Sequence, residues 1–401
     1  MLSQLVRALR RRLHPILQIA RATVNRTVYA LVARYRPLRP NSVILATNRG
    51  PVLTDNLRYI DKALDKTIYR IERHIITKRP FFARIAYEVR FIAAMAQAEY
   101  TLVDDFFPLV YPIRLRPGAR LIQVWHALGA FKQVGYSRSG RHGGPPLTSI
   151  SHRNYTDVIV SATSIRRDYA EAFGVDLEVV KATGIPRSDL FFDETRMARV
   201  RTRIRQELPF LRERRVILFA PTFRGRGRRS ADYPIEDLDL AAFGAALGEQ
   251  TILLIRMHPF VKRRPIIPEQ WADRIFDLGD YPEFNHLLLV SDLLITDYSS
   301  AIFEYALLGR PVLFYAPDLD QYWRERGFYY PFSEYAYGPV VPDFPSLLAA
   351  LDSAEYDEEQ AKRFRERFLD RCDGQATKRF IETVFSPTDF PVGPAATKGA
   401  G

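Results

Sequence analysis

The chain has 401 residues, a formal net charge of +12, 47% hydrophobic residues and a single cysteine. At about 150 residues per domain, this length predicts two domains, and the composition excludes a disordered or fibrous protein. The lone Cys372 excludes an internal disulfide, a cysteine-based zinc site and an iron–sulfur cluster, which favours a reducing, cytosolic compartment.

The basic charge is concentrated at the N-terminus. Residues 1–39 contain nine arginines and no acidic residue, so the rest of the chain is close to neutral. Apolar residues from Leu2 to Leu17 fall on one side of a helical wheel, with arginines beside and opposite them. This pattern predicts a basic amphipathic helical arm over residues 1–39, which Pro15 is expected to kink or divide.

Three roles are open for this arm. A basic amphipathic helix can pack on its own domain, lie on an anionic membrane surface or bind nucleic acid, and we favour the first two. Its uncharged runs are far shorter than the roughly 20 residues that a bilayer span needs. It also lacks the apolar core and the small-residue cleavage site of a signal peptide.

Beyond the arm, short apolar runs alternate with helical stretches, as is typical of parallel sheets with crossover helices. We therefore predict an α/β protein with two Rossmann-like domains, over residues 40–205 and 206–385, joined near Met197–Arg215. Residues 386–401 are predicted to be a disordered tail. A last helix, about Glu358–Thr383, is expected to pack back across the first domain. The predicted strands are Ser42–Ala46, Tyr100–Val103, Leu121–Trp125, Asp157–Ser161, Val216–Ala220, Thr251–Arg256, Leu293–Thr296 and Val312–Tyr315.

Three strand ends in the second half of the chain carry groups that bind anions. In doubly wound sheets, ligands bind beyond the carboxyl ends of the strands, so these groups form a candidate phosphate site. Ser299 or Ser300 is expected to cap a helix, whose N-terminus attracts phosphate. A serine at this position is also explained by capping alone, without a phosphate. The candidate residues are Thr222, Arg224, Arg256, His258, Thr296, Asp297, Ser299 and Ser300.

Two further candidates lie in the first half. His126 directly follows a predicted strand and precedes a turn with Gly129 and Lys132, so it is a candidate general base or else a structural histidine bonded to backbone. Arg187 lies in a tight turn, where it can line a cleft between the domains or pair with Asp189.

Other chemistries have little support. The acidic pairs Asp104–Asp105 and Asp318–Asp320 lie near strand ends, and the second resembles a metal-binding pair of one glycosyltransferase class, but we predict no metal and no other cofactor. The chain has no Gly-rich dinucleotide fingerprint, phosphate-binding P-loop, nucleophile elbow or His-Glu-x-x-His motif. The sequence motifs that would best support an oxidoreductase, an NTPase, a serine hydrolase or a zinc protease are therefore absent.

Taken together, these motifs resemble those of the CDP-glycerol glycerophosphotransferase family of teichoic-acid-type polymer synthesis. The resemblance runs over about residues 120–340 in matching order. The segments that carry it are Trp125-His126, Gly184-Ile185-Pro186-Arg187-Ser188-Asp189, Ala220-Pro221-Thr222-Phe223-Arg224, Arg256-Met257-His258-Pro259 and Thr296-Asp297-Tyr298-Ser299-Ser300.

The resemblance implies a glycosyltransferase-B-like fold with the nucleotide on the second domain and the acceptor entering from the first. It also implies a peripheral protein on the cytoplasmic face of the cell membrane, which favours the anionic membrane surface over nucleic acid as the partner of the arm. The implied reaction transfers glycerol phosphate from CDP-glycerol to a hydroxyl of a lipid-linked acceptor and releases CMP. His126 matches the family's catalytic base, His258 a second histidine near the pyrophosphate, and Ser299 and Ser300 the phosphate-binding end.

Several alternatives stay open beside this interpretation. CDP-ribitol or another CDP-polyol can replace CDP-glycerol, and a sugar-nucleotide glycosyltransferase or epimerase of the same fold would use the same strand ends. A non-enzymatic protein that binds membranes or nucleic acid through its basic charge is also possible. Ala127-Leu128-Gly129 replaces the Gly-Thr-Pro common in the family, so the loop on the acceptor side is expected to differ. The length favours a primase over a polymerase.

Overall fold

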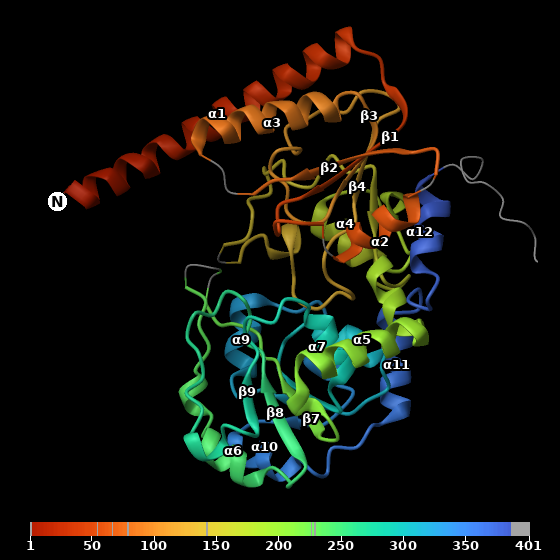
Figure 1. Ribbon diagram of the computed structural model, residues 1–401. Helices are drawn as coiled ribbons and strands as arrows, with labels where there is room; N and C mark the ends of the chain where they lie inside the picture. The colour runs from red at the N-terminus through yellow and green to blue at the C-terminus, as the bar shows by residue number, and fades with distance from the viewer. Residues whose placement is uncertain are drawn as a thin grey trace, which may run out of the picture.

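The computed structural model describes residues 2–385 apart from 54, 66, 78–79, 142, 226 and 228–229, with side chains described from Leu17 onward. The chain forms two lobes, each built around a parallel six-stranded sheet, and the lobes lie one above the other in Figure 1. The α/β fold with two Rossmann-like sheets, predicted from the alternation of apolar runs and helices, is thus confirmed.

The first lobe contains the sheet with strand order β2-β1-β3-β4-β5-β6. The chain leaves β1 toward the edge strand β2 and then returns to β3 on the other side of β1. The strand order therefore reverses between β1 and β3, and such a switch point is where doubly wound sheets leave a crevice for a ligand. The strands are β1 (Arg39–Thr47), β2 (Arg70–Ile75), β3 (Ala98–Val103), β4 (Arg120–Gln123), β5 (Asp157–Ile159) and β6 (Val180–Lys181).

The second lobe contains the sheet with strand order β12-β11-β10-β7-β8-β9. Its first strand, β7, lies in the middle of the sheet, as in doubly wound nucleotide-binding folds, and the switch point lies between β7 and β10. The strands are β7 (Arg215–Phe219), β8 (Thr251–Ile255), β9 (Ile275–Asp277), β10 (Leu293–Thr296), β11 (Val312–Tyr315) and β12 (Val340–Val341). Of all the strands, β2, β6, β9 and β12 were not expected from the sequence.

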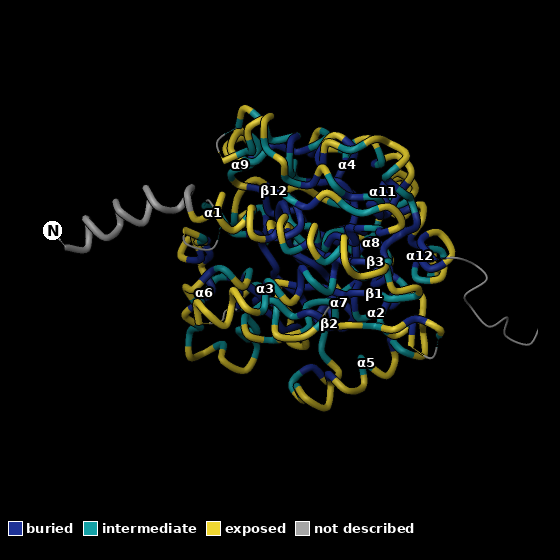
Figure 2. The backbone as a smooth tube through the Cα atoms, turned by 90° about the horizontal axis from the view of Figure 1, so that it is seen from above, coloured by how far each residue is buried: buried dark blue, intermediate teal, exposed yellow. Residues whose placement is uncertain are grey.

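Helices cover both sheets, so the strands are buried and the exposed residues lie mainly on the outer helices and loops (Figure 2). The α-helices are α1 (Leu2–Tyr35), α2 (Asp55–Leu64), α3 (Phe81–Met95), α4 (Arg166–Phe173), α5 (Glu194–Glu207), α6 (Leu240–Ala246), α7 (Phe284–Val290), α8 (Ala301–Ala306), α9 (Leu319–Arg326), α10 (Phe344–Ala350), α11 (Glu358–Phe368) and α12 (Ala376–Val384). Short 3₁₀ helices are η1 (Gly135–Arg138), η2 (Leu177–Val179), η3 (Pro186–Phe192), η4 (Pro209–Leu211), η5 (Ile235–Asp237), η6 (Glu269–Trp271) and η7 (Phe332–Glu334).

The N-terminal helix α1 lies along α3 on the outside of the first lobe (Figure 1). It is a single helix, so the expected division at Pro15 is wrong. Its C-terminal half packs on its own lobe: Arg21 forms an ion pair with the buried Glu88, and Asn25 and Tyr29 are buried. The amphipathic pattern predicted over the first turns falls on side chains outside the described part. No helix in the described residues is both long and apolar enough to cross a membrane.

The C-terminal segment returns to the first lobe, as expected, but the single helix predicted over about Glu358–Thr383 is in fact two helices, of which α11 packs on α8 of the second lobe. After α11, helix α12 packs against α2 and η3 of the first lobe (Figure 1). The Asp189 carboxylate accepts hydrogen bonds from the backbone N–H groups of Ala376 and Thr377 at the start of α12 (2.9 and 2.8 Å). The two lobes are therefore joined twice by the chain, through α5 and through the segment after α11. The predicted tail, residues 386–401, lies outside the described residues.

Candidate active site

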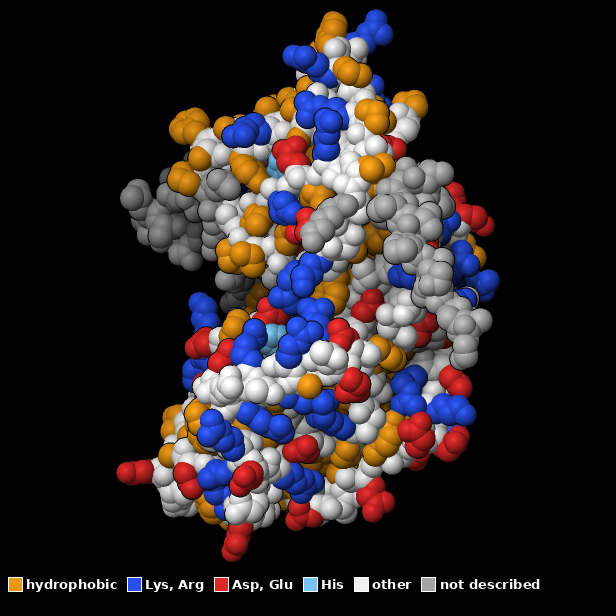
Figure 3. All heavy atoms as spheres, turned by 45° about the vertical axis from the view of Figure 1, so that its right-hand side comes forward, with side chains coloured by type: hydrophobic (Ala, Val, Ile, Leu, Met, Phe, Trp, Pro, Cys, Tyr) orange, Lys and Arg blue, Asp and Glu red, His pale blue; other side chains and the backbone are white. Residues whose placement is uncertain are grey.

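A cavity of about 430 Å³ lies between the lobes, where the carboxyl ends of both sheets face each other. In Figure 3, basic side chains and a histidine gather where the two lobes meet. Seven of the ten candidate residues line this cavity: His126, Arg187, Thr222, Arg256, His258, Ser299 and Ser300. The sequence motifs therefore converge on one site.

The switch point of the second sheet supplies the hydroxyl groups of the cavity. Thr222 follows β7, and its backbone N–H donates to Asp297 (2.7 Å). Ser299 and Ser300 follow β10 and precede α8. The Ser299 hydroxyl accepts a hydrogen bond from the N–H of Ala301 (3.3 Å), whereas Ser300, at the cap position, makes no capping hydrogen bond through its side chain. Ser299 thus has the capping contact, and Ser300 keeps its hydroxyl for another partner.

Three other candidates do not line the cavity. Arg224 pairs with both Asp297 (2.8 Å) and Asp318 (2.6 Å), so its charge is neutralised within the protein. The Thr296 hydroxyl donates to the carbonyl of Ala220 (2.7 Å) and is fully buried. These residues hold the ends of β7 and β10 together behind the cavity. Asp318, considered above as part of a metal pair, is a partner of Arg224, and no group of three metal-binding side chains occurs among the residues described.

Arg256 and His258 follow β8 and have different surroundings. The Arg256 guanidinium donates to the carbonyls of Met257 (2.8 Å) and Tyr281 (3.0 Å) and forms no ion pair within the described part of the chain. His258 Nδ1 accepts a hydrogen bond from the N–H of Phe260 (3.1 Å), which leaves the proton of the neutral ring on Nε2. Burial, together with the charges of Lys132 and Arg256, lowers the pKa of His258 to about 4. His258 is therefore neutral at pH 7 and can donate from Nε2.

Lys132 was not among the predicted site residues, although it belongs to the His126 motif. It comes from the first lobe and crosses the cavity, where its Nζ donates to the hydroxyls of Thr222 (3.1 Å) and Tyr322 (3.4 Å) of the second lobe. Burial lowers the pKa of Lys132 to about 8, and Asp297 opposes this effect. Like Arg256, it has no carboxylate within ion-pair distance among the described residues. The cavity thus contains two cations that lack a carboxylate partner.

His126 lies on the first lobe, three residues beyond the end of β4. The preceding residue, Trp125, has a φ of 46°, a left-handed conformation that is unusual for a bulky residue. The buried Asn56 secures this turn, because its Nδ2 donates to the carbonyls of both Val124 and Trp125 (2.9 Å each). Gly129 completes the loop with a φ of 63°, and a Cβ there would lie 2.1 Å from the Phe303 ring of α8. The main chain is therefore constrained on both sides of His126.

Arg187 connects the loop of His126 to the second lobe. Its guanidinium donates to the carbonyl of His126 (2.7 Å) and forms a buried ion pair with Glu304 of α8. The alternative pairing with Asp189 is wrong, because Asp189 binds the start of α12 instead. Arg187 lines the cavity, but its charge is matched by Glu304.

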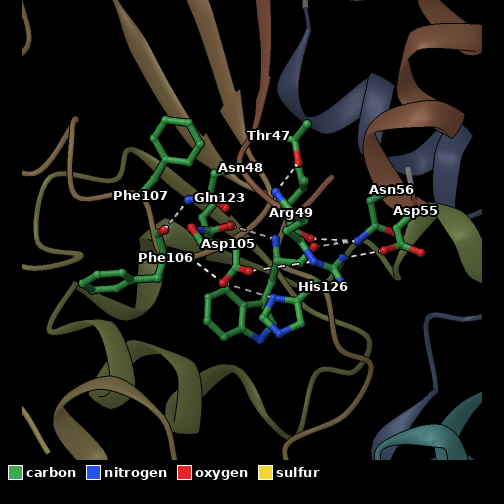
Figure 4. Close-up of polar contacts among 12 residues, drawn as sticks. Thr47, Asn48, Arg49, Asp55, Asn56, Asp105, Phe106, Phe107, Gln123 and His126 are labelled. Atoms are coloured by element: carbon green, nitrogen blue, oxygen red, sulfur yellow. Dashed lines mark hydrogen bonds and ion pairs between the residues drawn. The ribbon is translucent and has the colours of Figure 1, made fainter. Parts of the chain in front are cut away.

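Charged residues at the switch point of the first sheet surround the imidazole of His126 (Figure 4). Arg49 follows β1 and pairs with Asp55, and its Nε lies 3.8 Å from Asp105, which follows β3. Asp105 Oδ1 lies 3.5 Å from His126 Nδ1. Burial lowers the pKa of His126 to about 4, with Asp105 opposing the shift and Arg49 and Arg187 adding to it. His126 is neutral at pH 7, as a base must be. Sequence reasoning missed Arg49 and Asp55, and it considered Asp105 only for metal binding.

Comparison with known proteins identifies the family of the chain. The model of the CDP-glycerol:poly(glycerophosphate) glycerophosphotransferase family matches residues 28–386. The chain belongs to this family. The N-terminal boundary of the match falls within α1, so the match covers both lobes.

Among relatives, the chain is 41% identical over 360 residues to the teichoic acid poly(ribitol-phosphate) polymerase of Bacillus spizizenii, covering 89% of this chain and 58% of that protein. It is 30% identical over 297 residues to a teichoic acid glycerol-phosphate primase of the same organism, and the match covers 73% of this chain and 76% of that protein. The chain thus spans a little under six tenths of the ribitol-phosphate polymerase.

Among solved structures, the wall teichoic acid polymerase TagF superposes with a TM-score of 0.72 at 22% identity, covering 96% of this chain and 97% of that chain. The UDP-GlcNAc 2-epimerase from Neisseria meningitidis, solved with UDP-GlcNAc bound, has a TM-score of 0.55 at 12% identity. This superposition covers 85% of this chain and 99% of that chain. The chain therefore shares the glycosyltransferase-B-like fold of these proteins.

Proposed function

We propose that this protein transfers a polyol phosphate from a CDP-polyol to a hydroxyl of a lipid-linked acceptor and releases CMP, in teichoic acid synthesis. The observation that carries the proposal is the cavity itself. On one side it presents Arg256 and a neutral His258 of the second lobe together with Lys132, which reaches in from the first lobe, and this set of groups suits a diphosphate. On the first lobe it presents His126, a neutral imidazole that suits a hydroxyl.

The proposed reaction is a single displacement at phosphorus. The acceptor hydroxyl gives its proton to His126, and its oxygen forms a bond to the phosphorus that carries the polyol. The bond from this phosphorus to the bridging oxygen breaks, and CMP leaves with that electron pair. Such reactions are catalysed mainly by positioning and by stabilisation of charge on the phosphates.

The residues that face the diphosphate have separate tasks in this scheme. Arg256 and Lys132, whose charges have no carboxylate partner among the described residues, balance the two negative charges of the diphosphate. The Nε2 proton of His258 donates to a phosphate oxygen, and Ser300 supplies a hydroxyl beside it. No metal or other cofactor takes part. The first lobe, residues 40–205, receives the acceptor, and residues 206–385 hold the nucleotide.

For the donor, we propose CDP-ribitol ahead of CDP-glycerol. The higher identity to the ribitol-phosphate polymerase, over most of this chain, supports ribitol. CDP-glycerol, predicted from the sequence, is the second candidate because the matching family model carries its name. The geometry on the first lobe fits either, since both polyols are chains of hydroxyls.

We further propose that the protein acts as a peripheral protein at the cytoplasmic face of the membrane, on an anionic surface. The lipid-linked acceptor requires such a position. Exposed apolar side chains on α1 and α3 support it, among them Leu17, Ile19 and Phe82, the last of which is 83% exposed. Arginines on the same two helices, such as Arg34 and Arg84, can bind anionic headgroups. Nucleic acid is not a proposed partner.

Calorimetric titration of the purified protein with CDP-ribitol, CDP-glycerol, CDP and UDP-GlcNAc, with and without EDTA, tests the donor site without knowledge of the acceptor. We expect the CDP ligands to bind equally well in both conditions, CDP-ribitol most tightly. Release of CMP on addition of a lipid-linked acceptor then tests the reaction. Binding of UDP-GlcNAc alone, or of none of the ligands, would contradict the proposal.

A further inference from the structure

The pairing of His126 with a neighbouring carboxylate has a consequence for catalysis. Asp105 Oδ1 lies 3.5 Å from His126 Nδ1, and Nδ1 has no hydrogen-bond partner among the described residues. Figure 4 shows the carboxylate directed toward the imidazole edge. Hydrogen bonds of catalytic groups are often long in a protein without substrate and shorten in the complex, so this distance fits a contact that closes on binding.

The two partners are fixed relative to each other by one buried side chain. Gln123 Nε2 donates to the backbone carbonyl of Asp105 (3.0 Å), and Gln123 Oε1 accepts from the N–H of Trp125 (2.9 Å). Gln123 is fully buried and also donates to Tyr155 (2.8 Å), so its amide is held in turn. The main chains that carry Asp105 and His126 therefore form one rigid unit.

The negative charge beside His126 belongs to Asp105 rather than to its neighbour in sequence. Asp104 is fully buried, and burial raises its pKa to about 7. Asp105 is partly exposed, and its Oδ2 lies 3.8 Å from Nε of Arg49. Arg49 in turn is held by Asp55 at the start of α2. The charges near His126 thus form an ordered row across the switch point.

We propose that Asp105 is a positioning residue that holds the proton of neutral His126 on Nδ1 and leaves Nε2 free to accept the proton of the acceptor hydroxyl. This inference rests on the proposed function, since it assigns the partner of its base. After proton transfer, the carboxylate stabilises the imidazolium, and the proton leaves to solvent when the product departs. Asp105 itself stays ionised throughout, as in other carboxylate–histidine pairs.

Kinetics of CMP release test the role. We expect Asp105→Asn to lower kcat about 10- to 100-fold at pH 7, which is no more than the lower end of what the general base itself supplies, while the Kd of the CDP-polyol changes less than about twofold. Asp105→Glu should restore part of the loss. The control is Asp61→Asn, which removes a carboxylate from a pair with Arg73 on the same lobe. An unchanged kcat in Asp105→Asn would overturn the proposal.

The pH profile gives a second measurement. Asp105 and Asp55 raise the pKa of His126, whereas Arg49 and Arg187 lower it. Loss of the Asp105 charge should therefore lower that pKa further, and the acidic limb of the kcat profile should move to lower pH. At pH 7 the imidazole is neutral in both proteins, so the fall in kcat there reports the position of the proton. A limb that stays in place would contradict the pairing.

The tautomer can be observed without any turnover. In protein labelled with ¹⁵N-histidine, with the His126 signals identified by their loss in His126→Gln, we expect Nδ1 to be protonated and Nε2 to be unprotonated at pH 7. In Asp105→Asn the two tautomers should mix. If this holds but no CDP-polyol is turned over, the proposed function fails while the pairing stands. If wild-type protein is active but carries the proton on Nε2, only the pairing fails.

Discussion

The switch points of the two sheets face each other across one cavity, but their residues differ in how their charges are matched. After β1 and β3, Arg49 and Asp105 lie within a row of paired charges around His126. After β7, β8 and β10, the polar side chains that line the cavity are hydroxyls, a neutral histidine and Arg256, which has no carboxylate partner in the described chain. A site with matched charges is suited to moving a proton, whereas one with excess positive charge is suited to binding an anion.

The two switch points are also linked by side chains that reach from one lobe to the other. Lys132 of the first lobe completes the cationic side, and Glu304 of the second lobe neutralises Arg187 beside the His126 loop. Each switch point therefore depends on one residue from the opposite lobe. Predictions that separate proton transfer, lobe association and anion binding can break or sharpen this division.

The largest effect is expected from His126→Ala. Removal of the base should lower kcat about 10²- to 10⁴-fold, with little change in the Kd of the CDP-polyol, because the imidazole faces the acceptor side. CMP release gives kcat, and calorimetry gives Kd. A loss of donor affinity as large as the loss of turnover would show that the two sides are not divided in this way.

The next effect is on stability and comes from Glu304→Ala. The change leaves Arg187 charged and buried without its partner, which should lower the free energy of unfolding by about 3–5 kcal/mol. The molecule contains its own control, because Arg58 and Glu283 form a second ion pair between the lobes that is partly exposed. Glu283→Ala should cost only about 0–1 kcal/mol in urea unfolding. Equal losses of unfolding free energy in the two variants would show that burial of the ion pair does not determine its contribution.

A smaller effect is expected on donor affinity from Arg256→Ala. Loss of a charge-assisted hydrogen bond, about 1.5–3 kcal/mol, corresponds to a Kd raised roughly 10- to 100-fold. The control is Arg264→Ala on the same lobe, whose charge is already paired with Asp277 and Asp280 at the surface. Calorimetry with CDP-ribitol should show no change for this control. If both variants bind equally well, Arg256 does not contact the diphosphate.

The smallest effect is a pH dependence from Lys132, whose pKa is about 8. The cation is present below this pKa and is lost as the pH rises through it, so donor affinity should be constant below pH 7 and fall above pH 8 by at most tenfold per unit. Lys132→Arg, which stays charged, should remove this dependence. An affinity that falls equally in both proteins would place the titrating group elsewhere.

The sequence predicted the interior of the fold better than its edges. All eight strands named from apolar runs are present, and the four that were missed, β2, β6, β9 and β12, are the edge strands of the two sheets. An edge strand has one neighbour and needs no continuous apolar run. In β2, Arg70–Ile75, only Ile71 and Ile75 are apolar, and β6 and β12 have two residues each. Such strands exist because a neighbouring strand offers hydrogen bonds, which is information that the local sequence does not contain.

Only part of the site could be predicted, because contacts between residues distant in sequence also determine it. Strand ends indicated seven cavity residues, but they could not reveal which cations are neutralised, since the partners Asp318 and Glu304 are distant in sequence. Arg224 was therefore predicted to bind substrate, although two carboxylates hold it. Arg49 and Asp105 were missed as neighbours of His126 even though both follow predicted strands. The same strand-end argument, applied to β1 and β3, would have found them.

The return of α12 to the first lobe affects how the protein is made. Phe385, near the end of the described chain, packs against the rings of Tyr69 and Tyr100, 4.8 and 4.7 Å away. During synthesis the first lobe emerges before the second, yet its hydrophobic core is completed only by residues that are translated after the second lobe. The first lobe therefore stays incompletely folded while the second lobe is translated and folds. A chain truncated before α12 would leave this apolar surface open and prone to aggregation.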